Sequence, residues 1–79
     1  MSVKINPIGS NQTEVTKGND SFLFSYKTLV AANVAGVWYR TSKKWSVTTS
    51  KHINKWLDGI NAQAIEQDKL ESLFEHVNL

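Results

Sequence analysis

Hydrophobic and polar residues alternate in the first half of the chain, which is the pattern of β-strands that bury one face. The clearest case runs from Ser21 to Ala32, where Phe22, Phe24 and Tyr26 occupy alternate positions and so share one face. The preceding residues 17–20 contain a Gly-Asn pair, which predicts a turn. We therefore predict β-strands at about residues 3–8, 12–16, 21–32 and 37–47.

In the second half of the chain the apolar residues are spaced by three and four positions, which indicates two amphipathic helices. The two apolar stripes consist of Ile53, Trp56, Leu57 and Ile60, and of Leu70, Leu73, Phe74 and Val77. These stripes predict helices at about residues 49–58 and 66–77. The hydroxyl groups of Thr48, Thr49 and Ser50 stand where the first helix begins and can cap its free amides.

The order of these elements predicts one small α+β domain that spans residues 1–79. We expect a three- to four-stranded antiparallel meander, followed by two helices packed on one face of the sheet. A chain of this length buries only about 60% of the surface that it exposes when unfolded, so its core is marginal. A marginal core and three tryptophans favour self-association through a sheet edge or a helix face, and we expect a homodimer.

The composition excludes several classes of protein. The chain contains no cysteine, so it has neither disulfides nor cysteine-based zinc sites. No run approaches the ~20 apolar residues of a membrane span, and the first residues lack the apolar core of a signal peptide. We therefore expect a cytoplasmic protein.

Motifs for catalysis are missing from the sequence. It has no Gly-x-Ser-x-Gly elbow, no P-loop and no dinucleotide-binding glycine pattern. His52 has no histidine or carboxylate three or four positions further along, so we assign it a structural hydrogen-bonding role rather than a metal-binding one. We expect no enzymatic activity, no metal and no cofactor.

The formal net charge of +2 conceals an asymmetry along the chain. Residues 40–59 hold five basic residues and one acidic residue, whereas residues 60–79 hold one basic residue and four acidic ones. A local basic field of this kind attracts anions. We predict that the partner is bound by Arg40, Lys43, Lys44, Trp45, Lys51 and Lys55.

Two further features of this basic segment can contact a nucleic acid. The amides and hydroxyls at residues 48–50 can bind a phosphate, although helix capping is the ordinary role of such residues. An exposed indole beside a cation can stack on a nucleobase. Trp38 and Trp45 are the candidates for stacking, whereas Trp56 lies on the apolar face of its helix and is assigned to the core.

Several short motifs between about Phe22 and Gly59 resemble a small domain of unknown function that is common in phages and plasmids. The resemblance rests on an aromatic-Ser-Tyr-x-Thr strand, on Ser-Val-Thr-Thr at residues 46–49 and on His-Ile-Asn-x-Trp at residues 52–56. It implies an origin in a mobile genetic element. It implies no reaction.

Two functions fit these features. The first is a non-enzymatic binding protein of a phage or another mobile element, which contacts nucleic acid through its basic aromatic patch. The alternative is a small inhibitor or adaptor that binds an acidic surface of a host protein, for instance to block a defence system. Either function places the protein in the cytoplasm of the host cell, away from the membrane.

Overall fold

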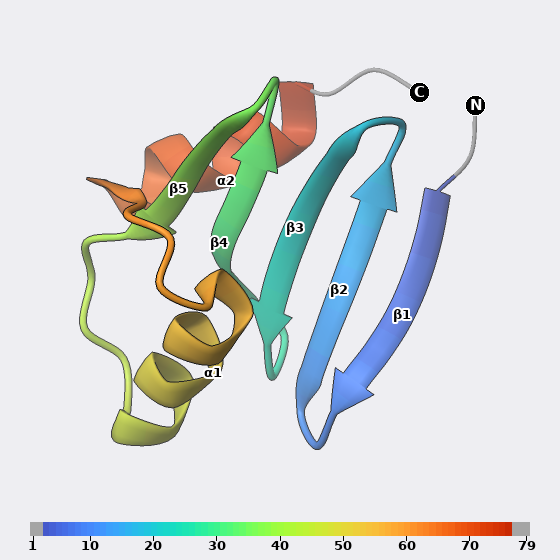
Figure 1. Cartoon of the computed structure of the whole chain (residues 1–79). Coiled ribbons are helices and arrows are strands. Elements are labelled where there is room, and N and C mark those ends of the chain that lie inside the picture. The colour runs from blue at the N-terminus through green and yellow to red at the C-terminus, as the bar shows by residue number, and fades with distance from the viewer. Residues whose placement is uncertain (1–2, 77–79) are drawn as a thin grey trace.

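The computed structural model describes residues 3–76, which form one six-stranded sheet and two helices (Figure 1). An antiparallel meander comprises β1 (Val3–Gly9), β2 (Gln12–Lys17), β3 (Asp20–Ser25), β4 (Thr28–Val34) and β5 (Val37–Thr41). The chain continues through α1 (Val47–Leu57), the short strand β6 (Gln63–Ile65) and α2 (Gln67–His76). β6 pairs in parallel with β5, so the strands lie in the order of the sequence. The α+β class is confirmed, but the sheet is longer than predicted.

The two helices cover opposite faces of the sheet (Figure 1), so the prediction that both pack on one face is wrong. Successive residues of a strand point to opposite faces. On β3, Leu23 therefore packs with the residues of α1, whereas Phe22 belongs to the cluster around Leu70 of α2. Since both faces are covered, β4 buries four consecutive apolar residues from Leu29 to Ala32. Such a run is the sequence signal of a strand that is buried on both sides.

The predicted strand at residues 21–32 is in fact two strands, β3 and β4, joined by a tight turn at Tyr26 and Lys27. Tyr26 adopts a φ of 60°, and its N–H donates to the carbonyl oxygen of Asn11 over 2.7 Å. Positive φ is uncommon for a residue other than glycine. The two turn residues include no Gly, Pro, Asn or Asp, so the sequence carries no ordinary signal for this turn.

A β-bulge at Val30 changes which side chains of β4 share a face with those of β3. Leu23 pairs with Ala31 and Phe24 pairs with Leu29, so Val30 has no counterpart on β3. Val30 joins the cluster on the α1 side, although simple alternation puts it on the same face as Phe22.

The predicted strand at residues 37–47 ends at Thr41, and residues 42–46 form a loop that leads into α1. α1 begins at Val47 and has Ser46 as its N-cap, two positions before the first of the predicted hydroxyls at residues 48–50. The Oγ of Ser46 accepts the backbone N–H of Thr49 over 3.1 Å, which satisfies one free amide of the first turn.

The remaining predicted elements agree well with the structure. The predicted helices at 49–58 and 66–77 correspond to α1 and α2, although Val77 lies outside the described residues. The turn at residues 17–20 is confirmed, because β2 ends at Lys17, β3 begins at Asp20 and Gly18 adopts a φ of 62°. Within residues 3–76, no helix is long and apolar enough to cross a bilayer.

Candidate functional site

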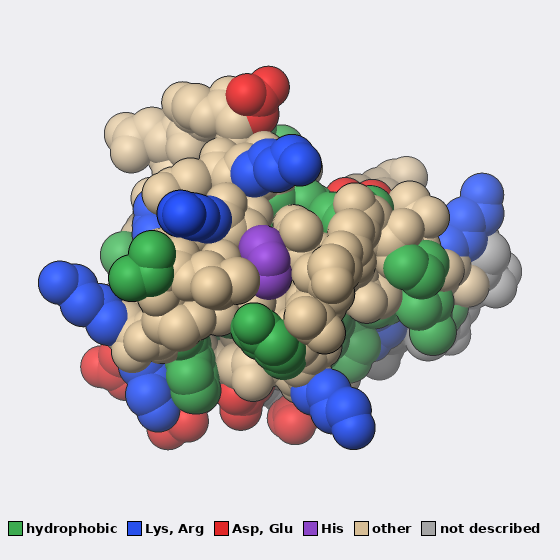
Figure 2. Space-filling view, turned by 90° about the horizontal axis from the view of Figure 1, so that it is seen from below, with side chains coloured by type: hydrophobic (Ala, Val, Ile, Leu, Met, Phe, Trp, Pro, Cys, Tyr) green, Lys and Arg blue, Asp and Glu red, His purple; other side chains and the backbone are tan. Residues whose placement is uncertain are grey.

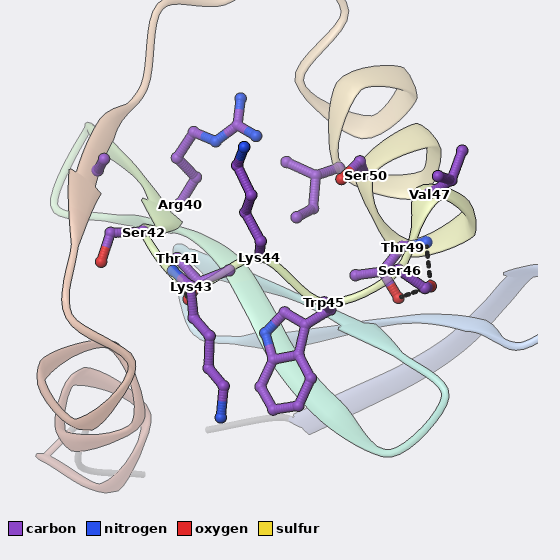
Figure 3. A pocket seen from close by; sticks show the side chains of 12 residues that line it. Arg40, Thr41, Ser42, Lys43, Lys44, Trp45, Ser46, Val47, Thr49 and Ser50 are labelled. Carbon is purple, nitrogen blue, oxygen red and sulfur yellow. Dashed lines mark hydrogen bonds between the residues drawn. The ribbon is translucent and has the colours of Figure 1, made fainter.

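A cleft of about 490 Å³ is lined by the end of β5, the loop at residues 42–46 and the first turns of α1 (Figure 3). We call it the basic cleft, because Arg40, Lys43 and Lys44 are among its lining residues. Figure 3 shows the side chains of Arg40 and Lys44 extending to the same side of the loop. Lys43 extends the other way, beside the ring of Trp45. The chain reversal between β5 and α1 thus brings three cations around one hollow.

The polar contacts of these cations leave their charge largely available. The Nη1 of Arg40 lies 3.5 Å from the Oδ1 of Asn54 on α1, which is a long and weak hydrogen bond. The Nζ of Lys43 lies 4.3 Å from the centroid of the Trp45 ring, a cation–π contact. Both partners are uncharged, so these contacts do not neutralise the positive field of the basic cleft.

Trp45 forms a wall between three adjoining hollows. Its side chain is 41% exposed and lines the basic cleft. It also lines a hollow of about 280 Å³, which we call the hydroxyl hollow because Ser25, Thr28, Ser46 and Thr49 line it too. The third hollow, of about 310 Å³, is lined by Glu71 and Glu75 and by one cation, Lys27, and we call it the acidic hollow. The ring is therefore bordered by a basic, a hydroxyl-rich and an acidic surface.

A network of hydrogen-bonded polar groups, of which Ser25, Thr49 and His52 are buried, lies at the wall of the hydroxyl hollow. The Oγ of Ser46 donates to the Oγ1 of Thr49 over 3.2 Å, and Thr49 lies 3.0 Å from the Oγ of Ser25. Ser25 in turn lies 2.8 Å from the Nδ1 of His52. Three segments, β3, the loop and α1, are joined by this hydroxyl–imidazole network, which comprises Ser46, Thr49, Ser25 and His52.

One arrangement of hydroxyl hydrogens satisfies the whole network. When Ser46 donates to Thr49, Thr49 can donate to Ser25 and Ser25 to the Nδ1 of His52. In that arrangement Nδ1 is an acceptor and the ring hydrogen is on Nε2. The His52 side chain is buried, with a relative exposure of 9%. The geometry supports the structural hydrogen-bonding role that the sequence assigns to His52.

The structure brings only some of the predicted site residues together. Arg40, Lys43, Lys44, Trp45 and Ser50 all line the basic cleft. Lys51 and Lys55 are exposed on α1 but do not line it, and Lys55 lines a separate hollow near the end of that helix. Figure 2 shows lysine and arginine side chains scattered over the surface rather than gathered in one patch.

The three predicted anion contacts differ in their availability. Thr48 is exposed and lies outside the basic cleft, whereas Ser50 is half-buried and lines it. Thr49 also lines the cleft, but it is buried and its hydroxyl belongs to the hydroxyl–imidazole network. Of the three residues, Ser50 is thus the one that lines the basic cleft and does not belong to the hydroxyl–imidazole network.

Trp38 and Trp56 have a structural role on the α1 side of the sheet. Both pack against the apolar cluster there, and their rings form an edge-to-face pair with centroids 5.4 Å apart. The Nε1 of Trp56 donates to the Oε2 of Glu14 over 2.8 Å. Trp45, which is 41% exposed, is therefore the most accessible of the three tryptophans.

Several residues of the site carry no signal in the sequence. Ser25 is separated from Thr49 by 24 positions and from His52 by 27, so only the folded chain shows that they meet. Ser46 does carry a signal, because serine is among the preferred N-cap residues and Ser46 precedes the amphipathic segment. Among residues 3–76 no three His, Cys, Asp or Glu side chains gather as metal ligands would.

Comparison with known proteins places this chain in a family without an assigned function. No significant match was found among the curated proteins or among the solved structures. A model of a family of unknown function, DUF8033, matches residues 3–72, which include every element of the sheet and most of α2. The protein is therefore a member of the DUF8033 family.

Proposed function

We propose that this protein is a non-enzymatic nucleic-acid-binding protein of a phage or another mobile genetic element. The observation that supports this proposal best is the basic cleft, where Arg40, Lys43 and Lys44 surround one hollow beside the exposed ring of Trp45. Cations bind phosphates along a nucleic-acid backbone, and an exposed aromatic ring offers a surface for a base. The cleft combines both kinds of contact within a few residues of the chain.

The number of cations in the cleft sets the expected salt dependence. Binding through Lys and Arg releases the counterions of the phosphates, so the affinity falls as the salt concentration rises. Three phosphate contacts predict a slope of log K against log salt of about −2.7 on a duplex and about −2 on a single strand. Such a small number of contacts also predicts a moderate rather than a very high affinity.

The test is a fluorescence anisotropy titration of labelled DNA and RNA at several salt concentrations. The double variant Lys43→Ala/Lys44→Ala should bind several-fold more weakly than the natural protein and show a smaller salt slope. Lys51→Ala/Lys55→Ala is the matched control, because it removes the same charge from exposed positions outside the basic cleft. Equal losses in the two double variants would show that the cleft has no special role. The absence of any binding at low salt would refute the proposal.

A second candidate function is an inhibitor or adaptor that binds an acidic surface of a host protein. Lys51 and Lys55 favour it, because they are exposed on α1 outside the basic cleft, where a broad protein surface can contact them and the cleft together. Affinity capture from a bacterial lysate separates the two functions. A stoichiometric protein partner that survives nuclease treatment supports the second function, whereas partners lost on nuclease treatment support the first.

A further inference from the structure

Two exposed aromatic side chains from distant parts of the chain line the hydroxyl hollow. Trp45 is 41% exposed and comes from the loop before α1, whereas Tyr26 is 51% exposed and comes from the turn between β3 and β4. Tyr26 is held there by a backbone with φ of 60° and by its hydrogen bond to Asn11. An uncommon backbone conformation that presents an aromatic ring to solvent directs attention to a functional role.

The walls of the hydroxyl hollow combine these two rings with hydrogen-bonding groups. Thr28 and Ser46 contribute hydroxyls, each of which can both donate and accept. Ser25 and Thr49 also reach the hollow. The hydroxyl of Ser25 is held by His52, and that of Thr49 is held by Ser25 and Ser46. A heterocyclic base has the matching properties, because it has a flat face for stacking and a polar edge for hydrogen bonds.

Lys44 and Trp45 line both the hydroxyl hollow and the basic cleft, so the two sites are continuous. A phosphate held by Arg40 and Lys44 therefore lies next to the hollow that suits a base. On the other side of Trp45, the acidic hollow is lined by two carboxylates, Glu71 and Glu75, and one cation, Lys27. Its charge is therefore less favourable to phosphates than the charge of the basic cleft, which contains Arg40, Lys43 and Lys44.

We propose that the nucleic acid bound here is single-stranded, and that one of its bases stacks on Trp45 inside the hydroxyl hollow. This inference rests on the function proposed above and specifies its substrate. A base inside an intact duplex is already stacked on both faces and presents only its edges in the grooves. A base that enters a hollow bordered by Trp45 and Tyr26 must be unstacked, as in a single strand or a loop.

The test compares the affinity of the protein for a labelled single strand with its affinity for the duplex of the same sequence. The strand has roughly a dozen nucleotides, which is within the usual range of single-strand sites. DNA and RNA versions are both titrated. The natural protein should bind the single strand at least tenfold more tightly than the duplex. Trp45→Ala should weaken single-strand binding roughly 5- to 150-fold, the range for losing one stacked base, and should leave the salt slope unchanged. Trp45→Phe, which keeps an aromatic face, should retain most of the affinity.

Three controls keep the outcomes separate. Circular dichroism and thermal melting of each variant confirm that the fold is intact. Tyr26→Ala should also weaken single-strand binding, whereas Val37→Ala, an exposed apolar truncation on β5 outside the hollow, should not.

Two outcomes would show that the single-strand inference is wrong while the nucleic-acid proposal stands. One is that the duplex binds as tightly as the single strand. The other is that Trp45→Ala has no effect on binding while Lys43→Ala/Lys44→Ala weakens it. If neither strand form binds, both proposals fail.

Discussion

Replacement of Ser25 tests how strongly the hydroxyl–imidazole network stabilises the fold. Its side chain is 2% exposed and lies 2.8 Å from Nδ1 of His52 and 3.0 Å from Oγ1 of Thr49. In Ser25→Ala, Thr49 keeps its hydrogen bond with Ser46, but Nδ1 of His52 loses its hydroxyl partner. A buried polar atom without a partner costs about 1–3 kcal/mol. We therefore expect the free energy of unfolding to fall by about 2 kcal/mol, which lowers the Tm by roughly 8–16 °C in a domain of this size.

The measurement is urea unfolding followed by tryptophan fluorescence and circular dichroism, with the free energy extrapolated to water. Ser72→Ala is the matched control. The Oγ of Ser72 donates to the carbonyl oxygen of Asp68 over 3.0 Å, but this hydrogen bond lies at the surface of α2. Water can replace it, so the control should change the free energy of unfolding by less than about 0.5 kcal/mol.

A double-mutant cycle with His52→Leu shows whether the cost arises from the unpaired nitrogen. When both partners are removed, no buried acceptor is left without a donor, so Ser25→Ala should cost less in the His52→Leu background. We expect a coupling free energy of about 1 kcal/mol or more between the two sites. If Ser25→Ala is no more destabilising than Ser72→Ala, or if the two changes are additive, the network does not have the role argued for it.

Three further predictions concern packing and association. Trp56→Ala should lower the free energy of unfolding, measured by urea unfolding, by about 3 kcal/mol. This value is the lower end of the range for buried aromatics, because Trp56 is half-buried. Lys17→Met should lower the Tm by several degrees, because it removes two contacts of the Nζ: the hydrogen bond to the carbonyl oxygen of Phe74 at 2.9 Å and the cation–π contact with the Phe74 ring. Lys17→Arg, which keeps the positive charge, should lower the Tm less. The predicted homodimer should be visible in sedimentation at micromolar concentration, and a monomer mass for the natural protein would contradict this prediction. Ile5→Lys should weaken the dimer, because Ile5 lies on the edge strand β1 and is 70% exposed.

Features that depend on near neighbours in the chain were predicted well from the sequence. The stripe that contains Ile53 and Leu57 predicts α1, because residues three and four positions apart lie on one helix face wherever the helix packs. The turn at residues 17–20 follows from the backbone freedom of Gly18 and Asn19. The positive field of the basic segment follows from composition alone.

Features that depend on the path of the chain needed the tertiary structure. Alternation shows that two faces of a strand differ, but it cannot show whether one helix or two will cover them. The turn at Tyr26 splits one predicted strand into two, because its conformation is held by a hydrogen bond to Asn11, 15 positions earlier, rather than by a local turn residue.

The candidate site shows the same division between local and distant information. The sequence identified Arg40 and Trp45 as site residues by charge and aromatic character, and the structure places both along the basic cleft. It also grouped Lys51 with them, although helical geometry carries that side chain outside the cleft. The hydroxyl hollow could not be predicted, because its walls come from two turns that are distant in the sequence. Folding brings these turns together because Ile53 and Leu57 of α1 pack against Leu23 of β3, and Ser25 bonds to Thr49 and His52, which are all contacts between residues far apart in the chain.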